Sequence, residues 1–145
     1  MHNRLIARAA LATVLVGAVA GCGAAQTVPR HAARLTIDGN THTTRPPACS
    51  QMQGYRTIDI VDHGAGNLDG RVEAVVLLSG ERVIPQWVKI RDVGGFTGSF
   101  WQGGVGDAHV DLAQSTYTIT GSAYGINDSN PNKTITTDFK IIAEC

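Results

Sequence analysis

Residues 135–145 read ITTDFKIIAEC, and this closing stretch carries the clearest secondary-structure signal in the chain. Its apolar and polar side chains alternate almost without a break: Ile135, Phe139, Ile141, Ala143 and Cys145 against Thr136, Asp138, Lys140 and Glu144. A period of two is typical of a β-strand that turns one face to a core and the other to water. The stretch therefore predicts a half-buried strand at the end of the chain.

The same signal extends back along the chain. Residues 116–125 place Tyr117, Ile119 and Ala123 on one face and hydroxyl side chains on the other. Shorter runs predict further strands at 35–37, 58–60, 72–78, 82–91, 95–101 and 107–112. The run at 72–78 is apolar enough for a strand buried on both faces, and Pro85 favours an edge or a bulge within 82–91.

The Gly-rich residues 102–106 favour a hairpin between 95–101 and 107–112. No segment after the N-terminal region has a convincing 3.6-residue apolar period, although 72–78 is short enough to be read as a helix as well. We therefore expect an all-β fold. Its expected architecture is an antiparallel β-sandwich or partly closed barrel of about seven or eight strands.

The first 22 residues read MHNRLIARAALATVLVGAVAGC and predict a lipoprotein signal peptide. A basic start precedes an uncharged run over 9–20, which is shorter than the roughly 20 apolar residues of a membrane-spanning helix. The sequence VAGC at 19–22 resembles a lipobox. Cleavage between Gly21 and Cys22 would remove residues 1–21 and leave the Cys22 thiol to carry a diacylglyceryl group. An ordinary secretory signal and a short membrane anchor are the alternatives.

Residues 22–33 are small, polar and aperiodic, and they are expected to tether a domain at 34–145 to the membrane. Diacylglycerol and an N-acyl chain on Cys22 supply at least two acyl chains, which is enough for stable attachment. Without residues 1–21 the chain keeps 10 basic residues against 12 acidic ones. That balance argues against a nucleic-acid binder, which needs a basic stripe, and it leaves the anchoring to the lipid.

The chain has three cysteines, and acylation of Cys22 leaves Cys49 and Cys145 for an intramolecular disulfide in an oxidising compartment. The bridge would close a loop of about 96 residues, which the loop-entropy relation values at about 4–5 kcal/mol. Two free thiols are the alternative. A metal site is disfavoured because the two cysteines lack a CxxC spacing.

Four stretches together resemble the mycobacterial 19 kDa lipoprotein antigen family. They are VAGC at 19–22, LTIDG at 35–39, YTITGSAYG at 117–125 and FKIIAEC at 139–145. Their order and spacing fit the family from about residue 34 to the end of the chain. The resemblance implies an envelope lipoprotein on the extracytoplasmic face of the cell membrane, exposed at the surface or shed in vesicles. Its acylated N-terminus is then of the kind that host Toll-like receptor 2 recognises.

The resemblance also implies a lipidated Cys22 and a Cys49–Cys145 disulfide, and it carries no enzymatic activity with it. Two departures limit what is transferred. The tether here is shorter and poorer in hydroxyl residues than in the family, which puts glycosylation in doubt. Residues 62–112 also diverge, so no ligand specificity is inherited.

Two groups of side chains could carry chemistry. Asp107, His109 and Asp111 share one strand face, and together with residues 62–63 they could hold a metal ion or relay a proton. The simpler interpretation is a strand face exposed to solvent. Ser99 is an isolated serine without the GxSxG turn of a serine hydrolase. No catalytic residue and no metal ligand is therefore assigned.

The aromatic residues of the middle segment are candidates for contact with an apolar ligand. Phe96 and Phe100 share a strand face with Gly98 between them, whereas Trp101 points the other way and Trp87 lies on a neighbouring segment. Glycine between aromatic rings leaves room for a ligand such as an acyl chain. The alternative is that the same rings fill the core of a small β domain.

The leading hypothesis is a non-enzymatic, surface-displayed lipoprotein antigen with no cofactor beyond its covalent lipid. Its expected partners are the membrane and Toll-like receptor 2. The alternative is a carrier of envelope lipids or other amphiphiles that uses a cavity lined by Trp87, Phe96, Phe100 or Trp101. An envelope hydrolase is the third hypothesis.

Overall fold

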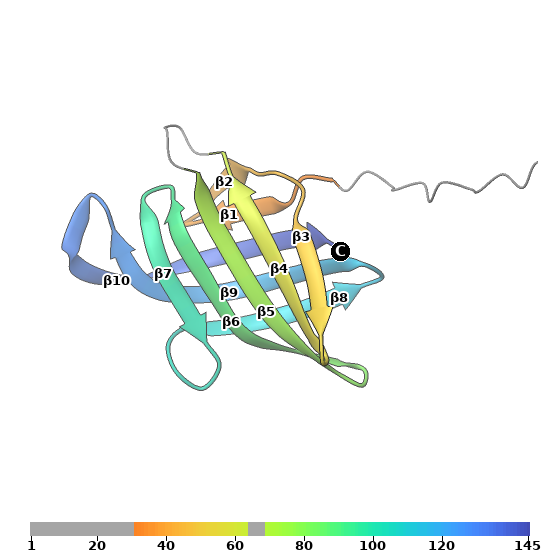
Figure 1. Ribbon diagram of the computed structural model, residues 1–145. Coiled ribbons are helices and arrows are strands. Elements are labelled where there is room, and N and C mark those ends of the chain that lie inside the picture. The colour runs from red at the N-terminus through yellow and green to blue at the C-terminus, as the bar shows by residue number, and fades with distance from the viewer. Residues whose placement is uncertain (1–30, 64–68) are drawn as a thin grey trace, which may run out of the picture.

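The computed structural model describes residues 31–63 and 69–145, which contain ten β-strands (Figure 1). They are β1 (Arg34–Ile37), β2 (Asn40–Thr43), β3 (Ala48–Met52), β4 (Tyr55–Asp62), β5 (Gly70–Ser79), β6 (Arg82–Val93), β7 (Phe96–Trp101), β8 (Asp107–Ala113), β9 (Thr116–Asn127) and β10 (Asn130–Glu144). Among these residues no helix is long and apolar enough to cross a membrane. The predicted signal peptide, Cys22 and the tether up to residue 30 lie outside the described residues.

The strands form one antiparallel sheet in the order β2-β1-β10-β9-β7-β6-β5-β4-β3, and β8 pairs with β9 as well. The sheet folds over into two layers, with β3 to β7 in one and β9, β10, β1 and β2 in the other (Figure 1). It does not close into a barrel, although a bridge between Thr44 and Asp62 joins the segment after β2 to the end of β4. The predicted all-β, antiparallel class is confirmed.

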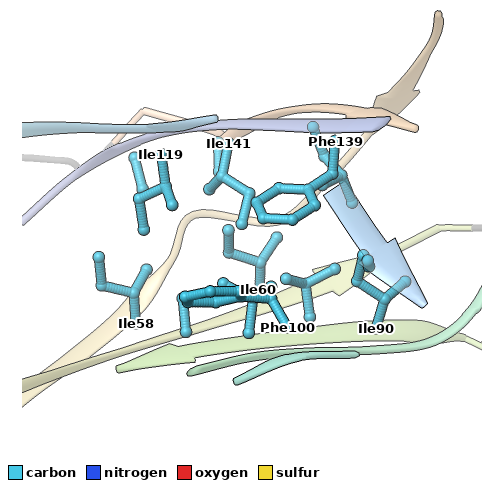
Figure 2. Close-up of a cluster of buried hydrophobic side chains, with 14 of the residues drawn as sticks. Ile58, Ile60, Ile90, Phe100, Ile119, Phe139 and Ile141 are labelled. Carbon is cyan, nitrogen blue, oxygen red and sulfur yellow. The ribbon is translucent and has the colours of Figure 1, made fainter. Parts of the chain in front are cut away.

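The hydrophobic core lies between the two layers. Figure 2 shows Ile58, Ile60, Ile90 and Phe100 from one layer facing Ile119, Phe139 and Ile141 from the other. Each of these side chains is at most 3% exposed. Tyr117 and Ala123 are also buried, so the faces predicted for β9 and β10 are the ones that fill the core. Burial of each large apolar side chain contributes about 1.5–3 kcal/mol, which makes this interface the main source of stability.

The sheet passes from one layer to the other at β7 and β9, and a pair of glycines allows this close approach. Gly98 of β7 lies opposite Gly125 of β9. A Cβ atom on Gly125 would lie 2.1 Å from the carbonyl oxygen of Thr97, and one on Gly98 would lie 2.5 Å from Cζ of Phe96. The room that Gly98 leaves is therefore occupied by the Phe96 ring of the same strand.

A disulfide joins the two layers at one end of the sandwich. Cys49 of the edge strand β3 is bonded to Cys145, directly after β10, and their Cα atoms are 5.8 Å apart. This is the pair that the sequence predicted. The bond connects residues 96 positions apart, so it links the first part of the domain to its last residue.

The predicted hairpin between 95–101 and 107–112 is wrong. β8 pairs with β9 instead, from Asp107 opposite Ser122 to Ala113 opposite Thr116. The reason is turn length: two residues close the β8–β9 turn, with Gln114 at a φ of 56°. β9 is long enough for β8 and β7 to pair along its same edge, one after the other.

The strand count also differs from the expected seven or eight, because β2 and β3 were not predicted. Both are short and mostly exposed, so they lack an alternating apolar signal. In β6 the predicted bulge is present: Val75 pairs with Trp87 and Val76 with Pro85, which leaves Gln86 as the extra residue. β5 is buried on both faces only around Val75, since Arg71 is exposed.

Candidate functional site

The outer surface of β3 to β7 carries exposed apolar side chains at one end. The ladders place Val75 opposite Trp87, and Trp87 opposite Trp101. Met52 lies opposite Tyr55 on the two neighbouring strands. Trp101 is 45% exposed, Tyr55 43% and Met52 76%, whereas Val75 lies buried beneath them. We call this set of five residues the aromatic face.

The two tryptophans of the chain form the centre of the aromatic face. Their ring centroids are 6.1 Å apart and their planes differ by 28°, which is a stacked arrangement. Trp87 points outward because the extra residue Gln86 at the bulge shifts the alternation of β6 by one position. Beside the pair lies an open groove of about 370 Å³, lined by Ser50, Met52, Gln53, Tyr55, Thr57, Val75, Gln86 and Trp87.

Charged side chains border the aromatic face on the same side of the sheet. The ammonium group of Lys89 lies 4.5 Å from the ring centroid of Trp87 and 5.4 Å from that of Trp101, a cation–π contact with both rings. Next to it, Arg71 donates two hydrogen bonds to the carboxylate of Asp59. The hydrogen bond with Asp59 raises the pKa of the Arg71 guanidinium above its usual value.

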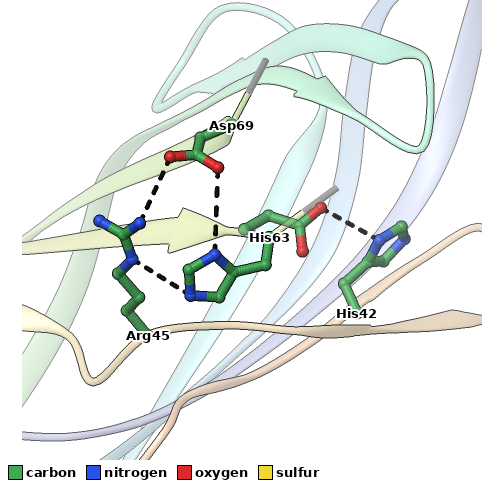
Figure 3. A network of polar contacts seen from close by, with 5 residues as sticks. His42, Arg45, His63 and Asp69 are labelled. Carbon is green, nitrogen blue, oxygen red and sulfur yellow. Dashed lines mark hydrogen bonds and ion pairs between the residues drawn. The ribbon is translucent and has the colours of Figure 1, made fainter. Parts of the chain in front are cut away.

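A second polar cluster lies at the end of the sandwich where β4 ends (Figure 3). Asp62 is 2% exposed, and its Oδ2 atom lies 3.3 Å from Nδ1 of His42. The two side chains are close enough for an ion pair, but their orientation gives Oδ2 of Asp62 no hydrogen bond. Alongside, Arg45 donates from Nε to Nε2 of His63 at 3.1 Å and pairs with Asp69 at 3.6 Å.

His42 also faces a small pocket of about 200 Å³ at this end. The pocket is lined by Ile37, Asp38, Asn40, His42, Val93, Gly94, Phe96, Asn127, Ile135 and Thr137. A buried carboxylate beside a histidine can orient the imidazole ring. The lining holds amide, hydroxyl, carboxylate and imidazole groups beside apolar side chains of the core, and neither cysteine nor serine is among its residues.

The structure separates the residues that were considered together for a metal site. His109 and Asp111 form an exposed pair on β8, with 3.1 Å between Nε2 and Oδ1, and Asp107 accepts a hydrogen bond from Ser122. Asp62 and His63 belong to β4 and its end, in the other layer, where they have the partners given above. Within the described residues no group of three His, Cys, Asp or Glu side chains could hold a metal ion.

The four candidate ligand contacts also fall into two groups. Phe96 and Phe100 are each 2% exposed and belong to the core, whereas Trp87 and Trp101 lie outside. Ser99 also faces outward, and its neighbours on the adjacent strands are Lys89 and Tyr124. Neither neighbour is the histidine that a serine nucleophile would use as its base.

Comparison with known proteins identifies the family to which the chain belongs. The model of the Mycobacterium 19 kDa lipoprotein antigen family matches residues 26–145. The chain belongs to this family. It is 61% identical over 145 residues, the whole of both chains, to the probable lipoprotein LppE of Mycobacterium tuberculosis. It is also 32% identical over its whole length to a Mycobacterium avium subsp. hominissuis protein named as a lipoprotein, of which the alignment covers 97%. The predicted family is thereby confirmed.

For this member of the 19 kDa lipoprotein antigen family, the sequence prediction missed three of the five residues of the aromatic face. Met52 is the last residue of β3 and Tyr55 the first of β4, both outside the strands predicted from the sequence, and Val75 lies in the run 72–78 that was predicted to be buried on both faces. A recoverable signal was the turn at Gln53-Gly54, flanked by Met52 and Tyr55, because a two-residue turn places its flanking residues opposite each other. The register that adds Val75 comes only from the fold.

Proposed function

We propose that this chain is a lipid-anchored, surface-exposed envelope lipoprotein whose β domain is a non-enzymatic display module. Cleavage after Gly21 leaves Cys22 as the N-terminal residue, carrying a diacylglycerol and an N-acyl chain. The observation that carries the proposal is family membership together with the VAGC sequence at 19–22. The alignment with LppE spans the whole chain and therefore covers residues 19–22.

The same proposal assigns host recognition to the lipid rather than to the domain. Toll-like receptor 2 would sense the acylated Cys22, which precedes the described domain in the sequence. The geometry of the domain supports a non-enzymatic role. The pocket that His42 lines, beside the buried Asp62, has no serine or cysteine in its lining, and His109 lies on an exposed strand face.

Replacing Cys22→Ala in the full chain tests both parts. We expect the variant to lose incorporation of an alkyne-labelled palmitate, to leave the membrane fraction and to lose activation of a Toll-like receptor 2 reporter line. The matched control is Gln26→Ala, which changes the tether but keeps the lipobox. Membrane retention together with full receptor activation by the Cys22→Ala variant would contradict the proposal. Labelling of the domain by a serine-hydrolase probe would contradict its non-enzymatic part.

The lipid-carrier hypothesis has one observation in its favour, the groove of about 370 Å³ beside Trp87. A carrier would hold its ligand there and not between Phe96 and Phe100, whose rings are packed in the core. Native mass spectrometry of residues 23–145 secreted from a mycobacterial host tests it. A lipid mass that is lost on unfolding and absent from a Trp87→Ala variant supports a carrier, and a bare mass counts against one.

A further inference from the structure

The outer surface of β3 to β7 has the composition of a membrane–water interface. Its aromatic face combines tryptophan, tyrosine and methionine side chains that are solvent-exposed at the level of 43–76% for Met52, Tyr55 and Trp101. The register adds Leu77 and Ile84 to the same end of this surface, opposite Tyr55 and Leu77 respectively. Amphipathic rings of this kind favour the headgroup level of a bilayer, where one end is apolar and the other wet.

The neighbouring part of the surface is charged, so the whole surface is amphipathic. The next row of outward side chains beyond the tryptophan pair contains Asp59, Glu73 and Lys89, which lie opposite one another on β4, β5 and β6. The row after that contains Arg71 and Arg91. Asp59 is paired with Arg71. Three cations against two carboxylates leave this part with a slight positive balance beside the apolar end. A long lysine side chain such as Lys89 can keep its stem on the rings and its ammonium group among phosphates.

The described start of the chain lies beside the end of β10, and the disulfide joins that end to β3 at the edge of this surface. The described chain begins at His31, whose Nδ1 lies 3.0 Å from Oε2 of Glu144. Glu144 precedes Cys145, which is bonded to Cys49, and Cys49 precedes Ser50 of the groove. Figure 1 shows the described start of the chain and the C-terminus at the same end, beside β3.

The length of the tether limits how far the domain can move from the bilayer. Residues 23–30 separate Cys22 from His31. Eight residues span at most about 30 Å when fully extended, which is comparable to the size of the domain itself. A domain held this close presents some face to the membrane. Six large apolar side chains are exposed among the described residues, and three of them, Met52, Tyr55 and Trp101, belong to the aromatic face.

We propose that the aromatic face is a membrane-contact surface, which lays the domain against the bilayer that carries its own lipid anchor. Trp87, Trp101 and Met52 enter the interface, and Lys89 meets the phosphates. The inference rests on the proposed anchoring at Cys22 for the identity of the membrane. The contact itself depends only on residues of the folded domain, so the two can fail separately.

Tryptophan fluorescence tests the contact directly, because the only two tryptophans of the chain lie in the aromatic face. The lipidated protein is reconstituted in vesicles of phosphatidylcholine and phosphatidylglycerol, with some lipids brominated on their acyl chains. We expect a blue-shifted emission that the bromines quench. Emission that stays unquenched while the protein remains on the vesicles would overturn the membrane contact and leave the anchor intact.

Partition of residues 23–145, which lack both the signal peptide and Cys22, separates the face from the anchor. The hydrophobic core formed by the described residues and the Cys49–Cys145 disulfide lie within residues 31–145, so this form keeps the fold. We expect it to co-sediment weakly with the same vesicles, and Trp101→Ala with Met52→Ala to reduce partition about tenfold or more, given roughly 25 cal/mol for each Å² of apolar surface. The control is Leu112→Ala, which removes an exposed apolar side chain of β8. Circular dichroism checks that each variant is folded.

Three results would overturn the proposal. The first is equal partition of the Trp101→Ala, Met52→Ala variant and the parent. The second is capture of monomeric lysophosphatidylcholine below its micelle concentration without binding to vesicles, which indicates a carrier groove. The third is a concentration-dependent dimer in solution that Trp101→Ala dissolves, which indicates contact between two copies of the chain.

Discussion

Two aromatic pairs lie on opposite faces of β6 and β7. Phe96 and Phe100 point inward and are 2% exposed, whereas Trp87 and Trp101 stack on the outside, with Trp101 45% exposed. The phenylalanines contact the opposite layer across the core, and the tryptophans contact Lys89 and solvent. Since neighbouring residues of one strand have such different surroundings, their roles differ as well. The inner pair serves the fold, and the outer pair is free to serve contact with something else.

The difference also shows how a small sequence change redirects a side chain. Without the bulge at Gln86, the register of β6 would turn Trp87 inward and Val88 outward. The bulge keeps Val88 in the core and Trp87 against Trp101. The aromatic face therefore depends on one extra residue beside Pro85, at a position where proline is tolerated because the ladder is already interrupted.

The largest loss of stability is expected from removing the disulfide that holds the two layers together. The double variant Cys49→Ala, Cys145→Ala should lower the free energy of unfolding by about 4.7 kcal/mol, the loop-entropy value for a loop of about 100 residues. Urea unfolding followed by tryptophan fluorescence measures it. Reduction of the parent protein serves as the control and should give the same midpoint. A loss below about 1 kcal/mol would mean that the core alone keeps the layers together.

The second largest loss of stability is expected from truncating Phe100 of the inner aromatic pair. Phe100→Ala should cost about 4 kcal/mol, because it removes a ring that is packed against both layers and leaves a cavity. The urea midpoint measures the loss, and the packing of Trp87 on Trp101 in near-ultraviolet circular dichroism shows whether the outer pair survives. A cost under about 1 kcal/mol would place Phe100 outside the cooperative core.

The inner face was largely predictable from the sequence, because alternation identifies a buried face wherever a strand is long. Tyr117, Ile119, Phe139 and Ile141 all occupy the predicted side. Strand pairing was less predictable, since alternation does not say which strand is the neighbour. The glycines at 103–104 favoured a hairpin between β7 and β8. In the structure the two-residue turn at Gln114 pairs β8 with β9 instead.

The outer face was hardly predictable, for two physical reasons. Its residues come from five strands, so only the register brings Met52, Val75 and Trp101 to one surface. A single exposed apolar residue carries no periodic signal of its own. In the same way, Asp62 and His63 stood together in the sequence, yet Asp62 turned to His42 inside and His63 to Arg45 outside.

A smaller loss of stability is expected from a substitution at the close approach of β7 and β9, where the two layers meet. Gly125→Ala should cost about 2 kcal/mol, because its Cβ would lie within 2.4 Å of Cα of Gly98 and force β7 and β9 apart. Urea unfolding measures the loss. Gly104→Ala is the matched control, since its Cβ would meet Trp101 at 3.4 Å and change stability by less than about 0.5 kcal/mol. Equal costs for both variants would mean that the close approach of β7 and β9 is not under steric constraint.

The smallest stability effect is expected on the outer face, where Trp101→Ala should cost about 1 kcal/mol. The variant loses stacking on Trp87 and a cation–π contact with Lys89, but it opens no cavity because the ring is already half in solvent. Urea unfolding measures the cost, and Trp101→Phe, which keeps a ring, should lie between the variant and the parent. A loss as large as that of Phe100→Ala would mean that Trp101 belongs to the structural core of the domain. A small loss together with reduced vesicle binding would separate the two faces by role, since the outer ring would then contribute more to contact than to folding.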